Sequence, residues 1–218
     1  DIPAGLRSLI KRCLTPEGLG PEDIDILVTV TTTGMLCPSL SALVSPRLGM
    51  RRNVQRMDIV GMGCNAGING LATVRGLAAA SPGRNAVLLS AEICSAGYVF
   101  DMSMRTAVVN SLFGDGVSAL LVRVNDEDDF TDGPRILDFE SYLVHEVGPD
   151  MRYDFEDGRW SFYLGRDIPY AIGATIERPV DALLTRHGLK RRDITHWIVH
   201  SGGKKVVDSI KYNLKITD

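Results

Sequence analysis

The sequence predicts a layered α/β sandwich built from two similar halves. The prediction depends on three patterns: a helical stripe of apolar residues near the start, a continuous apolar run after it, and the recurrence of both near the end. A helix with one apolar stripe must bury that stripe, and an uninterrupted β-branched run is typical of a strand covered on both faces. Helices layered on a sheet satisfy both requirements.

The first half begins with a predicted helix followed by a buried strand. The helix ends near Gly18 and has apolar positions at the i, i+3, i+4 spacing, namely Leu6, Leu9, Ile10, Cys13 and Leu14. The strand covers residues 24–31. We expect further buried strands at residues 86–91 and 118–124, and a long helix at residues 65–80.

The same order of residues returns in the second half. Gly18-Leu19 and Asp23-Ile24 match Gly188-Leu189 and Asp193-Ile194, and the first helix matches Ile176, Val180, Leu183 and Leu184. A chance match of this common unit is the alternative, but the degree of agreement favours duplication. We therefore expect residues 1–125 to form the N-terminal half and residues 126–218 the C-terminal half. The acidic stretch 125–134 would be a solvated connection.

Composition limits the classes of function. A net charge of −3 without a dense basic block argues against a nucleic-acid partner. The four cysteines lack Cys-x-x-Cys spacing, which predicts neither a metal site nor a disulfide framework. Because no apolar run approaches the roughly 20 residues of a membrane span, we expect a cytoplasmic protein. The chain has no initiating Met and opens in a helical pattern, so we expect the fold to be incomplete at both ends.

Cys64 is the first candidate catalytic residue. It lies in the glycine-rich segment 61–67, between a strand-like run and the predicted helix 65–80. A thiol at a helix N-terminus faces unpaired backbone N–H groups and the positive end of the helix dipole, which lower its pKa and can hold an oxyanion. The alternative is a small buried cysteine in a tight bend.

His200 is the second candidate. It ends the predicted strand of the second half, at the edge where catalytic groups gather in α/β sheets. Duplication would make its turn and the Cys64 turn neighbours, so that a Cys–His pair can form across the halves. We expect the other three histidines to be structural, namely His145, His187 and His196.

Three segments resemble the motifs of a known family. Residues 61–67 (Gly-Met-Gly-Cys-Asn-Ala-Gly), 111–116 (Ser-Leu-Phe-Gly-Asp-Gly) and 200–204 (His-Ser-Gly-Gly-Lys) are similar to the nucleophile, gatekeeper and histidine motifs of type III polyketide synthases. These enzymes are the chalcone synthase group of the thiolase superfamily, which implies a thiolase-like duplicated α-β-α sandwich. Three further segments are most similar to a bacterial member: residues 94–101, 104–110 and 151–154.

The resemblance implies a role for each matching residue. Cys64 matches the acyl-accepting nucleophile, and His200 matches the catalytic histidine. Phe113 and Phe162 match the two gatekeeping phenylalanines of the cavity mouth. Gly202 and Gly203 match the glycine turn that shapes the pocket beside the histidine.

The sequence departs from the family pattern at two places. The family's third catalytic residue, an Asn that follows the histidine, has no counterpart before Asp218. Cys37 stands where plant members carry Met, in a segment that resembles the one reaching into the partner subunit's cavity. A cavity shape inferred from plant enzymes therefore does not carry over.

The activity that the resemblance implies is decarboxylative Claisen condensation of malonyl units from malonyl-CoA on a Cys64 thioester. It needs no metal or redox cofactor, since CoA thioesters are the substrates. Relatives of this fold form homodimers near the nucleophile helix. The alternatives are a type III synthase that makes pyrones or alkylresorcinols, a ketosynthase III-like enzyme that depends on an acyl carrier protein, and a catalytically silent subunit that binds acyl-CoA.

Overall fold

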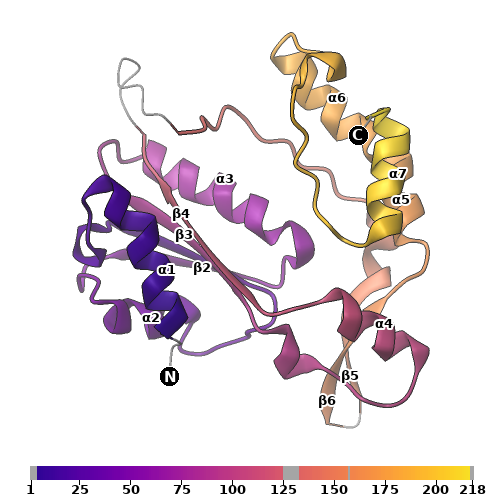
Figure 1. The fold of residues 1–218 in the computed structure, drawn as a ribbon, viewed down its shortest axis with the longest axis horizontal. Helices are drawn as coiled ribbons and strands as arrows, with labels where there is room; N and C mark the ends of the chain where they lie inside the picture. The colour runs from indigo at the N-terminus through magenta and orange to yellow at the C-terminus, as the bar shows by residue number, and fades with distance from the viewer. Residues whose placement is uncertain (1–3, 125–132, 157, 217–218) are drawn as a thin grey trace. The chain divides into compact units, whose positions relative to one another are not determined.

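A computed structural model describes residues 4–124, 133–156 and 158–216 (Figure 1). The chain forms two compact units, which we describe separately. Unit 1 comprises residues 1–96 and 114–136, and unit 2 comprises residues 97–113 and 137–218. These units interleave along the chain, so they are not the halves 1–125 and 126–218, whose boundary stays a prediction.

Unit 1 is a four-stranded sheet with helices on both faces. Its sheet has the order β2-β1-β3-β4, in which β1 pairs in parallel with β2 and β3, and β4 runs antiparallel to β3. The elements of the unit are α1 (Ala4–Leu14), β1 (Ile26–Thr31), α2 (Leu40–Leu48), β2 (Gln55–Val60), α3 (Ala66–Ala79), β3 (Ala86–Glu92) and β4 (Gly116–Val122).

The two faces of β1 contact different helices. Leu27 packs in a core with residues of α1 and α2, whereas Ile26 and Val28 pack in a core with residues of α3. Figure 1 shows α1 and α2 on one side of the sheet and α3 on the other. All six residues of β1 are buried, which confirms the prediction of a strand covered on both faces.

Gly70 lets α3 lie close to this sheet. A Cβ atom at Gly70 would come within 2.6 Å of a Val30 methyl carbon and 2.8 Å of a Leu88 methyl carbon. A larger residue would therefore push the helix away from β1 and β3.

The predicted strand at residues 118–124 exists, but its predicted burial is wrong. It forms β4, in which Val117 and Leu120 are each 49% exposed. Among the described residues β4 pairs with β3 alone. An edge strand has one neighbour, so fewer of its side chains are covered than in a central strand.

Unit 2 contains four helices and a two-stranded hairpin. The antiparallel strands β5 and β6 pair so that Tyr153 lies opposite Phe162. Helices α5 and α7 pack together around a core that includes Val206 and Ile210. The elements are α4 (Met104–Leu112), β5 (Met151–Glu156), β6 (Arg159–Leu164), α5 (Ile168–Thr175), α6 (Glu177–Arg186) and α7 (Lys204–Leu214).

The repeated sequence forms the same turn in both units. Gly18 and Gly188 lie in the turns that follow helices α1 and α6 and have φ angles of 68° and 66°. The backbone N–H of Gly20 donates to Asp23 at 2.8 Å, and the N–H of Lys190 donates to Asp193 at 2.8 Å. Side-chain capping of this kind fixes a turn locally.

The prediction of a strand after the second turn is wrong. Residues 195–200 form no strand, and Ile198 is fully exposed. In the first copy the corresponding strand, β1, pairs with β2 and β3. In the part of the chain that the structure describes, no strand pairs with residues 195–200. A strand needs a partner for its backbone N–H and C=O groups. The predicted acidic connection falls largely on residues 125–132, outside the described residues.

Candidate active site

The Cys64 turn follows the carboxyl end of β2. Gly61 and Gly63 have φ angles of 75° and 71°, a region that glycine enters without strain. A short 3₁₀ turn at Gly63–Asn65 leads into α3, so Cys64 lies directly before the first turn of that helix. The sequence prediction of a cysteine at a helix N-terminus is confirmed.

The predicted low pKa of Cys64 is not found in this chain. The residue is exposed, so reagents can reach it. Desolvation by the protein atoms packed around the thiol nevertheless raises its pKa, and the charge of Glu92 raises it further, whereas a backbone hydrogen bond lowers it. Desolvation and a nearby carboxylate both disfavour a thiolate, and together they outweigh the backbone hydrogen bond that favours it.

The Glu92 side chain forms hydrogen bonds with the loop that follows β1. Its carboxylate accepts hydrogen bonds from the backbone N–H of Thr32 at 2.7 Å and of Thr33 at 2.9 Å, and from the Thr33 hydroxyl at 2.7 Å. The Thr33 hydroxyl in turn accepts the N–H of Ile93 at 2.9 Å. The sequence analysis did not identify Glu92, although a lone carboxylate at the end of an apolar strand is a signal for such a role.

His200 lies in unit 2, directly before a glycine turn. A Cβ atom at Gly202 would lie 3.1 Å from Cδ2 and 3.3 Å from Nε2 of His200, so glycine permits the imidazole to lie against the backbone. Gly203, with a φ of 104°, precedes α7. The imidazole therefore lies against the backbone of the turn, and the role of this glycine pair in shaping a substrate pocket stays a prediction.

The structure brings the two predicted gatekeepers together. The rings of Phe113 and Phe162 lie 5.2 Å apart with an interplanar angle of 76°, an edge-to-face contact. Phe113 ends α4, and the Tyr98 hydroxyl donates to the Phe113 carbonyl oxygen at 2.5 Å. The ring of Tyr153 lies 5.1 Å from that of Phe162.

Tyr153 belongs to this aromatic cluster and Tyr98 is hydrogen-bonded to the Phe113 backbone beside it, and the sequence analysis identified neither of them. Alternation of aromatic residues at 153 and 155, and at 160 and 162, was the available signal, because residues two apart lie on the same face of a strand. At the end of α6, Nε2 of His187 is within hydrogen-bond distance of Oδ2 of Asp138, at 3.0 Å. This contact agrees with a structural role for His187.

The candidate residues belong to different units. Cys64 lies in unit 1, whereas His200, Phe113 and Phe162 lie in unit 2. The Cys64–His200 pair therefore stays a prediction. Among the described residues, no group of three or more His, Cys, Asp or Glu side chains could hold a metal ion. The same residues include no helix that is long and apolar enough to cross a membrane.

A family model described as FAE1/Type III polyketide synthase-like protein matches residues 3–133. The chain belongs to this family. This type III polyketide synthase-like chain is 49% identical to the 3,5-dihydroxyphenylacetyl-CoA synthase of Streptomyces toyocaensis, over 97% of its own length and 55% of the relative's. The enzyme of the same name from Amycolatopsis orientalis is also 49% identical, over 99% of this chain and 58% of the relative.

More distant relatives are polyketide synthases as well. The 1,3,6,8-tetrahydroxynaphthalene synthase of Streptomyces peucetius subsp. caesius is 32% identical, over 94% of this chain and 55% of the relative. The crystal structure of PKS-I from the brown alga Ectocarpus siliculosus matches with a TM-score of 0.90 at 27% identity, and the match covers 97% of this chain and 56% of that one.

These comparisons confirm the predicted family and the thiolase-like α/β fold class. They also confirm the predicted similarity to a bacterial member, 3,5-dihydroxyphenylacetyl-CoA synthase, over nearly the whole chain. The type III polyketide synthase-like chain spans little more than half the length of the curated relatives it matches, 55% and 58% for the two synthases of that name.

Proposed function

We propose that the intact protein is a malonyl-CoA-dependent acyltransferase that makes 3,5-dihydroxyphenylacetyl-CoA, a precursor for glycopeptide antibiotics. One observation carries the proposal. Synthases of that name are 49% identical over nearly the whole chain, whereas a synthase of a different aromatic product, 1,3,6,8-tetrahydroxynaphthalene, is 32% identical. The higher identity extends beyond the motifs that all family members share.

In the proposed mechanism Cys64 is the nucleophile and His200 is its partner. The Cys64 thiol attacks a malonyl-CoA carbonyl, which releases CoA and leaves a thioester on the sulfur. A second malonyl-CoA loses CO2 to give an enolate, whose oxygen accepts a hydrogen bond from His200. The enolate carbon attacks the thioester carbonyl and forms the new carbon–carbon bond, while the bond to sulfur breaks and the Cys64 thiolate leaves, so that the lengthened chain is carried by CoA. No metal or redox cofactor takes part in these steps.

The raised pKa of Cys64 makes a partner necessary for this mechanism. Desolvation and the Glu92 charge favour the neutral thiol. A cationic imidazole within about 4–6 Å of the sulfur would stabilise the thiolate and reverse that preference. In the proposal His200 supplies this charge once the units are assembled around the substrate.

The aromatic cluster supports a dry reaction chamber. Phe113 and Phe162 contact each other edge to face, and Tyr153 extends the contact. In the proposal this cluster stands at the mouth of the cavity of the intact protein, where it would exclude water that hydrolyses the thioester. It would also exclude bulky starters, which is why we expect a malonyl unit as both starter and extender.

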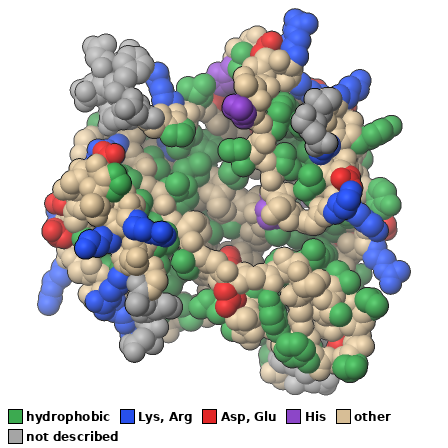
Figure 2. Space-filling view, viewed as in Figure 1, with side chains coloured by type: hydrophobic (Ala, Val, Ile, Leu, Met, Phe, Trp, Pro, Cys, Tyr) green, Lys and Arg blue, Asp and Glu red, His purple; other side chains and the backbone are tan. Residues whose placement is uncertain are grey.

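We also propose a cytoplasmic homodimer. The carboxyl ends of β1 and β2 are neighbours in the sheet, since Thr31 lies opposite Val60. The segments that follow them expose Met35, Met62 and, in α3, Ile68, which is 60% exposed. Figure 2 shows hydrophobic side chains exposed among charged ones on the face that it draws. Sedimentation of the intact protein at micromolar concentration should give a dimer, and a monomer would contradict the proposal.

The product that the intact protein makes distinguishes the proposed activity from its alternatives. The intact protein should convert malonyl-CoA alone into a dihydroxyphenylacetyl ester or acid, detected by mass spectrometry. Pyrones or alkylresorcinols formed only with an added acyl-CoA starter would assign it to another type III branch. Turnover of malonyl groups on an acyl carrier protein, but not on CoA, would assign it to the ketosynthase III-like class.

A variant pair tests the nucleophile. Cys64→Ala should abolish carbon–carbon bond formation, because no thioester can form, while slow decarboxylation of malonyl-CoA continues. Cys94→Ala is the matched control, since it removes a neighbouring, partly buried thiol. Retained condensation in Cys64→Ala would refute the assignment, and equal loss in both variants would indicate damage to the fold.

A further inference from the structure

A cleft of unit 1 lies at the end of the sheet opposite Cys64, where β1 and β2 begin. Its walls are α1, the turn after α1 and the last residues of α2, which lead into the amino ends of β1 and β2. Cys64 instead follows the carboxyl end of β2. The cleft has a volume of about 300 Å³, which is the lower end of the range for small-molecule sites.

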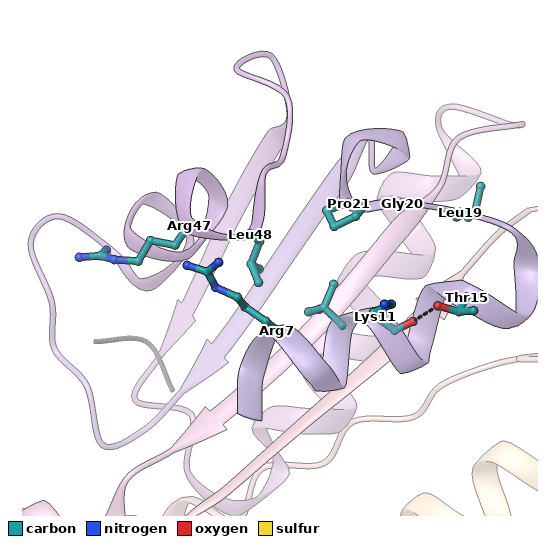
Figure 3. A pocket seen from close by; sticks show the side chains of 9 residues that line it. Arg7, Lys11, Thr15, Leu19, Gly20, Pro21, Arg47 and Leu48 are labelled. Atoms are coloured by element: carbon teal, nitrogen blue, oxygen red, sulfur yellow. Dashed lines mark hydrogen bonds between the residues drawn. The ribbon is translucent and has the colours of Figure 1, made fainter. Parts of the chain in front are cut away.

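The cleft combines an apolar floor with a basic rim. Ile10 and Leu48, which line it, are 0% and 8% exposed. Arg7 and Lys11 rise from α1, and Figure 3 shows the Arg7 side chain extending toward the end of α2, where Arg47 and Leu48 lie. None of the ion pairs found among the described residues includes any of these three cations.

The second copy of the repeat carries an ion-pair network at the same positions. Arg7, Lys11 and Pro21 correspond to Glu177, Asp181 and Arg191, at the same separation that relates Gly18 to Gly188. Arg191 donates to Asp181 at 2.6 and 2.7 Å and to Glu177 at 2.9 Å. The second copy thus has both signs of charge, whereas the first has two cations facing a proline.

We propose that the cleft of the first copy binds a small organic anion, whose phosphate or carboxylate lies between Arg7 and Lys11 and whose apolar body lies on Leu19 and Leu48, above the buried Ile10. The ligand supplies the negative charge that Glu177 and Asp181 supply in the second copy, where the cation is Arg191. The volume is that of a small-molecule site. This inference is independent of the proposed function.

Calorimetric titration of the intact protein tests the proposal with three matched probes: phenyl phosphate, phenylacetate and neutral benzyl alcohol. At least one of the two anions should bind, and benzyl alcohol should not. Binding of only one anion identifies the head group. The double variant Arg7→Gln/Lys11→Gln should weaken binding of that anion at least about tenfold, because two charge-assisted contacts are lost.

Two further variants distinguish binding in the cleft from a general effect of surface charge. Arg12→Gln removes a neighbouring cation of α1 that does not line the cleft, and it should change the affinity less than about twofold. Pro21→Glu keeps all three cations but adds an internal carboxylate, and it should weaken binding about tenfold by competition. Absence of binding by both anions, or equal weakening by Arg12→Gln, would overturn the proposal.

Discussion

The two copies of the helix–turn–strand sequence reach different structures after the same turn. In the first copy, Gly18 and the Asp23 cap lead into β1, all of whose residues are buried between two neighbouring strands. In the second copy, Gly188 and the Asp193 cap repeat the turn, but the residues that follow form no strand and Ile198 is fully exposed.

The difference separates local from non-local encoding. A left-handed glycine and a capping carboxylate need only residues within the turn, so both copies form it. A strand needs partners for its backbone and neighbours for its side chains, and these come from distant parts of the chain. Three pairs of variants test this distinction, each at equivalent positions of the two copies.

The largest difference is expected between Val28→Ala and Ile198→Ala in this 218-residue chain. Val28 is fully buried, so its truncation should cost about 2 kcal/mol of unfolding free energy through lost burial and a cavity. Ile198 is fully exposed, so its truncation should change the stability by less than about 0.5 kcal/mol. Denaturant unfolding measures both. Equal costs would contradict the structural difference between the copies.

The turn variants should behave alike. Gly18→Ala and Gly188→Ala each place a Cβ in open space but at φ angles of 68° and 66°. The cost is therefore that of the left-handed backbone alone, about 1 kcal/mol in each copy. Hydrogen exchange at the amides of Leu19 and Leu189 would report each turn separately. A large effect in only one copy would show that the turns depend on their surroundings.

The smallest effect concerns pH and the second copy alone. Arg191 holds the pKa of Asp181 below its usual value. The pair therefore stabilises the fold above about pH 4 and loses this contribution as the pH falls through the lowered pKa. Because Asp181 is half exposed, we expect only about 0.5 kcal/mol. Arg191→Ala should remove this part of the acid dependence, whereas Pro21→Ala should leave the acid dependence unchanged.

The sequence predicted elements whose pattern is regular. The helix at residues 65–80 and the strand at 86–91 were found within a few residues as α3 and β3, because each buries a continuous apolar surface. Strand β2 was predicted only as a strand-like run before the Cys64 turn, without bounds, because its first residues, Gln55-Arg56-Met57-Asp58, read as polar. Helix α2 contains Pro46, which concealed it from a search for helical patterns.

The parts of the candidate site that depend on one short motif were predictable from the sequence. The turn of Cys64 and the glycines beside His200 depend on neighbours in sequence. The hydrogen bond that the Thr32 N–H donates to the Glu92 carboxylate joins residues 60 positions apart. Only the pairing of β1 with β3 brings the carboxylate to the loop. The pKa of Cys64 was mispredicted for the same reason, since Glu92 and the surrounding protein atoms act on it through the fold.

The missing side chain at Gly70 has a consequence for the engineering of this chain. The contacts with Val30 and Leu88 leave no room for even one methyl group, so alanine at this position must tilt or lift α3. Cys64, the proposed nucleophile, lies directly before the same helix, so its sulfur would move with it. If the proposed condensation takes place there, substitution of a residue that never meets the substrate would shift the reacting atom, and the rate would fall because the two carbon centres must meet along one line of approach.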